Sequence, residues 1–145
     1  MPRVASWISV EPSANPAAIL GPLPFVGGEK VYPLPASVVP PNAEGILIFA
    51  WAALAGVNTS LTGGKAPLAY WHFASALPDG SRNWFSLIVA GNSVAGGVQC
   101  NSQAFWLPMP RDRCLRVTLT GGPLSSPVNQ GEVEIHGYYP AQATT

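Results

Sequence analysis

The sequence predicts an all-β protein, an antiparallel β-sandwich of about eight strands, of jelly-roll type, with a proline-rich extended N-terminal arm. Sixteen prolines and fifteen glycines interrupt the 145 residues every few positions. No window of a dozen residues lacks both and also shows the apolar period of a helix, whereas several short segments alternate apolar and polar residues as half-buried strands do. We expect an arm over 1–25, a sandwich domain over 26–140 and a C-terminal tail over 141–145.

The arm and the first strands follow from proline placement. Residues 1–25 are rich in Pro, Ala and Ser and predict an extended segment with one short strand over 6–10. A strand is expected over 28–32. The prolines at 33, 35, 40 and 41 then exclude a central strand, because proline cannot donate to a strand ladder.

The strongest predicted strand, GILIFAWAAL over 45–54, is apolar on both faces. Alternation places Ile46, Ile48 and Ala50 on one face, and Leu47, Phe49 and Trp51 on the other. A strand of a two-layer sandwich normally has one polar face. The second face is therefore expected to be covered, either by the arm or by another subunit.

A hairpin is predicted over 68–77 and 82–91, because Pro-Asp-Gly between two apolar runs is a turn sequence. Further strands are expected over 98–101, 104–107, 114–120 and 132–139. In 114–120 the inward residues are Leu115, Val117 and Leu119. In the last strand Val133, Ile135 and Tyr139 are expected on one face, with Glu132, Glu134, His136 and Tyr138 on the other.

The charge content restricts the classes of partner. Only 10% of the residues are charged and the net charge is zero, whereas a typical domain has about 25% charged residues. Nucleic-acid binding and polybasic membrane anchoring both need a surplus of Lys and Arg. The longest apolar run, 46–55, is too short to insert across a membrane. The first residues do not form a signal peptide, so the chain either is not secreted by that route or is a mature form with an added Met.

The segment FWLPMPRDRCLRVTL, 105–119, predicts a strand, a tight connection and a second strand. Asp112 caps the turn and the arginines solvate the edge in one interpretation. In the other, Arg111 and Arg113 form a partner-binding rim with Trp106 as its anchor, because Trp and Arg are enriched at interface hot spots.

Three segments together carry a family resemblance: Pro35–Ala43 before an apolar strand, Phe105–Arg113, and the closing Ile135–Tyr138. They resemble stand-alone jelly-roll domains of marine invertebrates, similar in architecture to the C1q/TNF class. The resemblance implies a trimer-forming binding or structural module without enzymatic activity, and one that often follows collagen-like or secreted segments.

The two cysteines, Cys100 and Cys114, leave two alternatives open. A disulfide between them would close a 15-residue loop, add roughly 3 kcal/mol of stability and indicate an oxidising compartment. The other alternative is a pair of buried free thiols. Asn58 begins a glycosylation sequon, Asn-Thr-Ser. An extracellular location is favoured, with a virion or cytoplasmic one as alternatives.

The sequence shows no catalytic motif, and we expect neither a cofactor nor a metal. His72 and His136 are expected to be structural or surface residues, since a zinc site made of them with Cys100 and Cys114 lacks ligand spacing. Glu132 and Glu134 share a strand face and could bind calcium, but a solvated edge is the favoured interpretation.

Aromatic and polar residues around the predicted hairpin fit sugar recognition, which uses a ring for stacking and polar groups for hydroxyls. The candidate ligand-binding residues are Tyr70, Trp71, Asp79, Arg82, Asn83 and Trp84. The alternative is that these rings fill the core or a subunit interface. Three functions are therefore carried forward: a self-associating structural or adhesion module, a lectin-like carbohydrate-binding protein, and a small virion capsid or decoration protein. For the first, the predicted interface residues are Phe49, Trp51, Trp106, Arg111 and Arg113.

Overall fold

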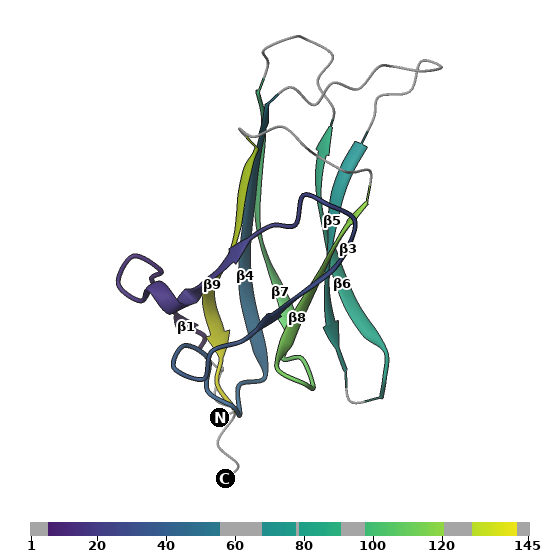
Figure 1. Cartoon of the computed structure of the whole chain (residues 1–145). Coiled ribbons are helices and arrows are strands. Elements are labelled where there is room, and N and C mark those ends of the chain that lie inside the picture. The colour runs from purple at the N-terminus through teal and green to yellow at the C-terminus, as the bar shows by residue number, and fades with distance from the viewer. Residues whose placement is uncertain (1–5, 56–67, 78, 91–97, 121–128, 142–145) are drawn as a thin grey trace.

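The computed structural model describes residues 6–55, 68–77, 79–90, 98–120 and 129–141 (Figure 1). It confirms an antiparallel β-sandwich. One sheet, sheet A, has five strands in the order β1-β9-β4-β7, with β2 also paired to β9; sheet B has four in the order β3-β8-β5-β6. The elements are β1 Ile8–Ser9, η1 Pro16–Ala18 (a 3-10 turn), β2 Ile19–Pro22, β3 Gly28–Pro33, β4 Gly45–Ala55, β5 Leu68–Ala76, β6 Arg82–Ala90, β7 Val98–Pro108, β8 Cys114–Thr120 and β9 Gln130–Tyr139.

Strand pairing is nested along the chain. β5 pairs with β6, β4 with β7, β3 with β8 and β2 with β9, each pair antiparallel. Successive pairs alternate between the two sheets. One long folded hairpin therefore supplies all four strands of sheet B and the strands β2, β9, β4 and β7 of sheet A. This order places the first two described strands, β1 and β2, beside the last one, β9.

The N-terminal segment is part of sheet A. β1 and β2 both lie within the predicted arm and extend the sheet by pairing with β9. The sequence predicted only the first of them. The Ile-Leu-Gly-Pro of β2 has no alternation to reveal it, and its register is irregular between Ile19 and Gly21. The arm therefore continues the edge of the sheet, and its two strands do not lie across the second face of β4.

Buried side chains from both sheets fill the space between them. Ile46, Ile48 and Ala50 of β4 face this core, as do Leu115, Val117 and Leu119 of β8, as predicted. Phe73 contacts Phe105 across the two sheets, with ring centroids 5.0 Å apart. The hydroxyl of buried Ser75 also joins the sheets, because it donates to the carbonyl of Pro108 at 2.6 Å.

The hairpin β5–β6 is confirmed, with the turn chemistry that was expected. Gly80 has φ +86°, which glycine adopts without strain. A carboxylate oxygen of Asp79 accepts from the backbone N–H and from the hydroxyl of Ser81. These bonds lower the pKa of Asp79, because they stabilise its charged form.

Two strand predictions are wrong. β7 is one continuous strand where two were expected, because Ser102 and Gln103 keep pairing with Trp51 and Ala50. In β9, Tyr138 and Tyr139 lie on the faces opposite to those predicted for them. A register shift opposite Leu47/Ile48 inserts an extra residue, so Tyr138 packs against the core and Tyr139 contacts Trp106 on the outer face.

Of the two alternatives for the cysteines, the structure has free thiols, although neither is fully buried. β7 and β8 do not form a hairpin but lie in different sheets, so their cysteines are separated by the core. Cys100 is exposed on sheet A and Cys114 is half-buried on sheet B. Asp112 caps the connection between these strands, as one interpretation predicted, by accepting from the N–H of Cys114.

Arg113 has a structural role that the interface prediction did not include. Its guanidinium donates to the carbonyls of Leu34, Val39 and Pro40, at 3.2, 2.8 and 3.3 Å. Its own backbone is left-handed, with φ 58°. Because the side chain joins the β7–β8 connection to the β3–β4 connection, it is not free to form a rim for a partner.

Candidate functional site

The outer face of sheet A, which we call the A face, carries a group of aromatic side chains. It is formed by β4, β7 and β9 together with the residue that precedes β1. Its members are Trp7, Leu47, Phe49, Trp51, Trp106, Glu132, Glu134, His136 and Tyr139. Three of the predicted interface residues, Phe49, Trp51 and Trp106, lie here.

The rings of the A face form two contact groups, one around Trp106 and one around Phe49. Trp106 lies 5.6 Å from Trp7 and 4.5 Å from Tyr139, measured between ring centroids. The ring of Phe49 stacks on His136 at 4.7 Å with an interplanar angle of 16°. Trp7 and Trp106 are 45% and 40% exposed. The A face is therefore an ordered aromatic surface that the described part of the chain leaves open to solvent.

Gly137 allows Trp7 to reach this surface. A Cβ at position 137 would lie 2.7 Å from the Trp7 ring and 2.8 Å from the carbonyl oxygen of Ile8. Because the position has no side chain, the indole can cross β9 and meet Trp106. Sequence reasoning missed Trp7 and Gly137, since a tryptophan in an extended arm shows no periodicity.

Gly137→Ala is expected to lower the free energy of unfolding by about 2 kcal/mol, because the added methyl displaces both the indole and the β1 backbone. Chemical denaturation at fixed protein concentration measures this. Gly27→Ala is the matched control, since a Cβ there has no atom within 4 Å. Equal stability of the two variants would contradict the packing of Trp7 on Gly137.

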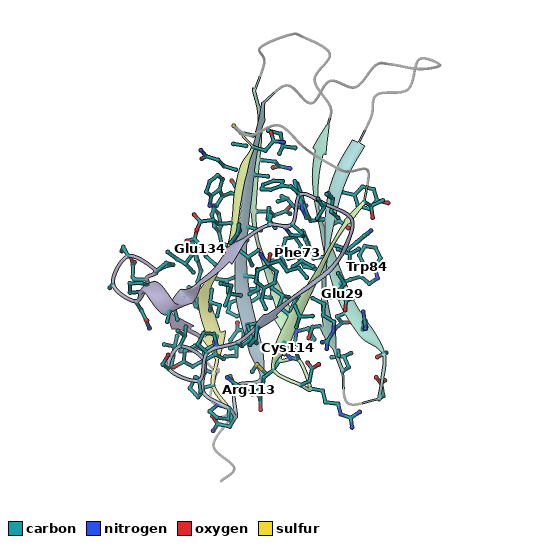
Figure 2. All side chains as sticks on the ribbon, in the orientation of Figure 1. Glu29, Phe73, Trp84, Arg113, Cys114 and Glu134 are labelled. Carbon is teal, nitrogen blue, oxygen red and sulfur yellow. The ribbon has the colours of Figure 1, made fainter. Side chains whose placement is uncertain are left out.

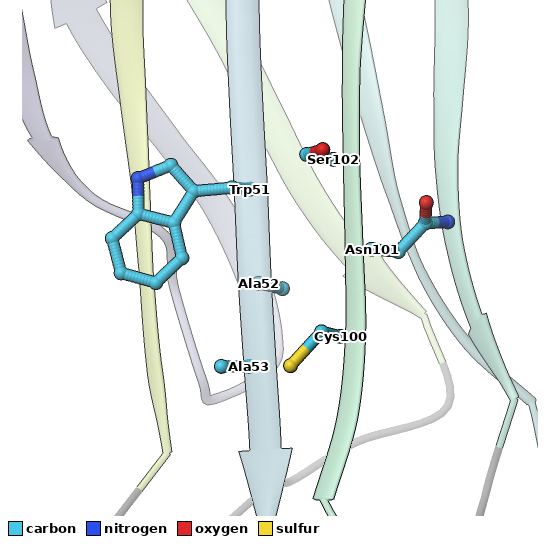
Figure 3. A pocket seen from close by; sticks show the side chains of 6 residues that line it. All are labelled: Trp51, Ala52, Ala53, Cys100, Asn101 and Ser102. Atoms are coloured by element: carbon cyan, nitrogen blue, oxygen red, sulfur yellow. The ribbon is translucent and has the colours of Figure 1, made fainter.

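A hollow of about 480 Å³ lies at the end of the A face where β4 and β7 run side by side. It is lined by Trp51, Ala52, Ala53, Cys100, Asn101 and Ser102 (Figure 3). Small side chains leave this space beside the Trp51 ring. The hollow is open, and it extends the A face toward β7, the edge strand of sheet A.

Residues considered for metal binding are dispersed. His136 and Cys100 are on the outer side of sheet A, whereas His72 and Cys114 belong to sheet B. Glu134 contacts His136 Nε2 at 3.3 Å. Within residues 6–55, 68–77, 79–90, 98–120 and 129–141, no group of three or more His, Cys, Asp and Glu side chains could hold a metal ion. No helix in the same part of the chain is long and apolar enough to cross a membrane.

The outer face of sheet B, which we call the B face, carries polar groups and one very exposed ring. Its members are Glu29, Val31, Tyr70, His72, Ala74, Arg82, Trp84, Ser86, Arg116 and Thr118 (Figure 2 labels Glu29 and Trp84). Three of the predicted sugar-binding residues, Tyr70, Arg82 and Trp84, lie on it, with Tyr70 and Arg82 toward opposite ends of the β5–β6 hairpin.

The other three predicted sugar-binding residues do not join them. Trp71 is completely buried and donates from Nε1 to the carbonyl of Pro24 at 2.7 Å, so its ring belongs to the core and cannot stack on a ligand. Asn83 falls on the opposite side of β6 from Trp84, as strand alternation requires. Asp79 is engaged in the hairpin turn.

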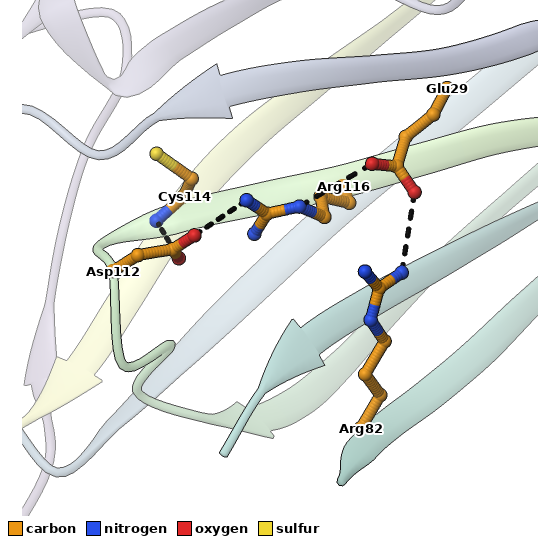
Figure 4. A network of polar contacts seen from close by, with 5 residues as sticks. All are labelled: Glu29, Arg82, Asp112, Cys114 and Arg116. Carbon is orange, nitrogen blue, oxygen red and sulfur yellow. Dashed lines mark hydrogen bonds and ion pairs between the residues drawn. The ribbon is translucent and has the colours of Figure 1, made fainter. Parts of the chain in front are cut away.

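An ion-pair chain crosses the B face (Figure 4). Glu29 contacts Arg82 at 3.3 Å and Arg116 at 3.4 Å, and Arg116 donates to Asp112 at 2.5 Å. The Arg116 bond is the main cause of the lowered pKa of Asp112 and of the raised pKa of Arg116. Arg116 Nη1 is buried and has no hydrogen-bond partner among the described residues.

Two predicted residues remain. Arg111 is exposed in the β7–β8 connection and its N–H donates to the carbonyl of Ala76. Asn58 lies outside the described residues.

Comparison with known proteins adds no assignment, because no protein-family model matches the chain and no curated protein matches it. Any functional proposal therefore depends on the two faces themselves.

Proposed function

We propose that the protein is a non-enzymatic, self-associating β-sandwich module for structural assembly or adhesion, and that copies associate through the A face. The observation that carries this proposal is the presence of two aromatic groups on one sheet face, Trp7–Trp106–Tyr139 and Phe49–His136. Aromatic residues with few charges are typical of the buried centre of interfaces between subunits.

A second copy of the chain is the occupant that fits this face best. The protein has zero net charge, so two copies meet without the repulsion that a strongly charged protein would show. Glu132 and Glu134 lie along β9, on one side of these aromatic groups, and give a polar margin. An aromatic centre with a polar margin is the usual anatomy of an interface.

The edge of sheet A supports the same proposal. In the described part of the chain β7 pairs only with β4, and residues 100–104 are exposed on both sides of the strand. Monomeric proteins usually protect such an edge with charges or proline. Residues 98–107 contain neither.

The nested strand order also bears on the class of protein. We infer that the fold is a jelly roll, because a long hairpin wound into two four-stranded layers gives that architecture. Jelly rolls occur in virion proteins and lectins, so the virion alternative stays compatible with an assembling chain. A trimer is the stoichiometry that the C1q/TNF-like resemblance implies. The extracellular location is retained on that resemblance and on the sequon at Asn58.

Ala104→Glu tests self-association without removing any ring. Ala104 is exposed, lies on the A face and pairs with Phe49, so a glutamate there places a charge inside the proposed interface. We expect light scattering to give a multiple of 15.2 kDa for the natural protein and a mass near 15.2 kDa for the variant.

The matched control is Val31→Glu on the B face, which is expected to keep the assembled mass, since Val31 is equally exposed but lies on the other sheet. A natural protein that stays at 15.2 kDa at every concentration would remove the proposal. A mass of three chains would agree with the trimer.

A further inference from the structure

Trp84 is the most exposed aromatic side chain among the described residues, at 66%. Covering an exposed indole with a ligand is favourable, because it removes apolar surface from water. The other half-exposed tryptophans, Trp7 and Trp106, contact each other on the A face. Trp84 lies on the opposite sheet, so the self-association proposed above does not account for it.

The indole of Trp84 is held in place by its neighbours. His72 contacts it edge-on, with centroids 5.5 Å apart and an interplanar angle of 82°. The hydroxyl of Ser86 lies 2.9 Å from His72 Nδ1 and fixes that ring. Tyr70 also contacts His72, with ring centroids 4.7 Å apart. A fixed, exposed ring is suited to stacking, because little conformational entropy is lost when a ligand covers it.

A small residue lies beside this ring. Ala74 pairs with Trp84 on one side and with Arg116 on the other, so all three lie in one row across the B face. The methyl group of Ala74 is short, and the ion pair between Arg82 of β6 and Glu29 of β3 spans the two strands between them, β5 and β8, at this level. The indole of Trp84 is therefore an aromatic wall beside a polar wall that this ion pair and Arg116 form.

The polar wall offers donors and acceptors together. Glu29 presents a carboxylate, Arg82 and Arg116 present guanidinium groups, and these charges come from three different strands. Hydroxyl groups both donate and accept hydrogen bonds, so a wall of this composition complements a polyhydroxylated ligand. The carbon-bound hydrogens of a sugar ring would cover the indole at the same time.

The charges of the wall favour a neutral ligand. Glu29 and Asp112 already neutralise Arg82 and Arg116, so the four groups sum to zero. An anionic ligand would have to displace one of these carboxylates from its arginine. We propose that the B face binds a neutral saccharide, with Trp84 as the stacking platform and the Glu29–Arg82–Arg116 group as its hydrogen-bonding wall.

The test is an array that carries neutral oligosaccharides (glucan, mannan, galactan and N-acetylhexosamine oligomers) beside sialylated, uronate and sulfated ones. The full-length natural protein is expected to bind neutral members. Trp84→Ala should weaken that binding by about ten-fold or more, which corresponds to the loss of one aromatic contact. Ala74→Leu should also weaken it, because the larger side chain displaces the Arg82–Glu29 ion pair that crosses β5 here and leaves Trp84 in place.

Val26→Ala is the matched control, since Val26 is as exposed as Trp84, at 67%, but lies in the segment between β2 and β3, so its loss should leave both binding and assembled mass unchanged. Binding to acidic members alone, binding that survives Trp84→Ala, or no binding to any neutral member would each overturn the proposal. A change of assembled mass in Trp84→Ala would also overturn it, because it would make Trp84 a contact between copies.

This test separates the saccharide proposal from self-association. Array signals increase when several copies of a binder are joined. The Ala104→Glu variant is therefore titrated in solution with the neutral oligosaccharide found on the array, and amide chemical shifts are followed. Shifts at β5 and β6 in a monomeric variant support the saccharide site, and shifts confined to β4 and β9 contradict it.

Discussion

Replacing Trp71 with alanine is expected to lower the free energy of unfolding by about 4 kcal/mol. The ring is completely buried at the centre of the sandwich and contacts Phe25 edge-on. Alanine leaves a cavity that the surrounding strands cannot close, because protein interiors are packed as densely as crystals. The carbonyl of Pro24 also loses the hydrogen bond from the indole Nε1.

Trp84→Ala provides the matched control, since both substitutions remove a tryptophan from neighbouring strands of sheet B. Trp84 is 66% exposed, so its loss is expected to change the free energy of unfolding by less than about 0.5 kcal/mol. Both values come from denaturant titrations at one fixed protein concentration, because association makes apparent stability concentration-dependent. Equal destabilisation by the two variants would contradict the burial of Trp71 on β5 and the exposure of Trp84 on β6.

Trp71 and Trp84 show how far the sequence determines a site. Alternation correctly places Tyr70 and His72 opposite Trp71 and Phe73, but it does not say which set faces the core. That choice depends on the other sheet, whose Phe105 packs on Phe73. The sequence therefore predicts that one aromatic set of this strand faces outward, and the structure is needed to identify it.

Local chemistry could be predicted better than long-range pairing. The Pro-Asp-Gly turn, the cap by Asp112 and the alternation of β8 are written in neighbouring residues, and all three are observed. The partners of β7 and β8 are set by the winding of the whole chain, so the sequence left open whether Cys100 and Cys114 are bridged or free, and the structure has them free. Likewise, Glu29 could not be linked to Arg82, because 53 residues separate them.

Arg113→Ala is expected to lower the free energy of unfolding by about 3 kcal/mol. Its guanidinium donates to three carbonyls of the segment between β3 and β4, at Leu34, Val39 and Pro40. Hydrogen bonds from a charged donor are stronger than neutral ones, and here several depend on one side chain. Removal takes this donor from the carbonyls of Leu34 and Val39, while the carbonyl of Pro40 still accepts from the N–H of Ala43.

Arg111→Ala is the matched control, because Arg111 lies in the same connection with an exposed side chain, and its backbone bond to Ala76 does not depend on the side chain. We expect a change within about 0.5 kcal/mol for this variant, measured in the same denaturant titration. If Arg111→Ala destabilises the protein as much as Arg113→Ala, the carbonyl contacts are not the source of the effect.

Arg113→Gly separates the side chain from the backbone. Arg113 has φ 58°, a conformation that costs an L-residue roughly 1–2 kcal/mol and glycine almost nothing. Glycine loses the same three hydrogen bonds as alanine but is relieved of this strain. The glycine variant should therefore be more stable than the alanine variant by about 1 kcal/mol. The reverse order would show that the left-handed backbone is not retained once the guanidinium is removed.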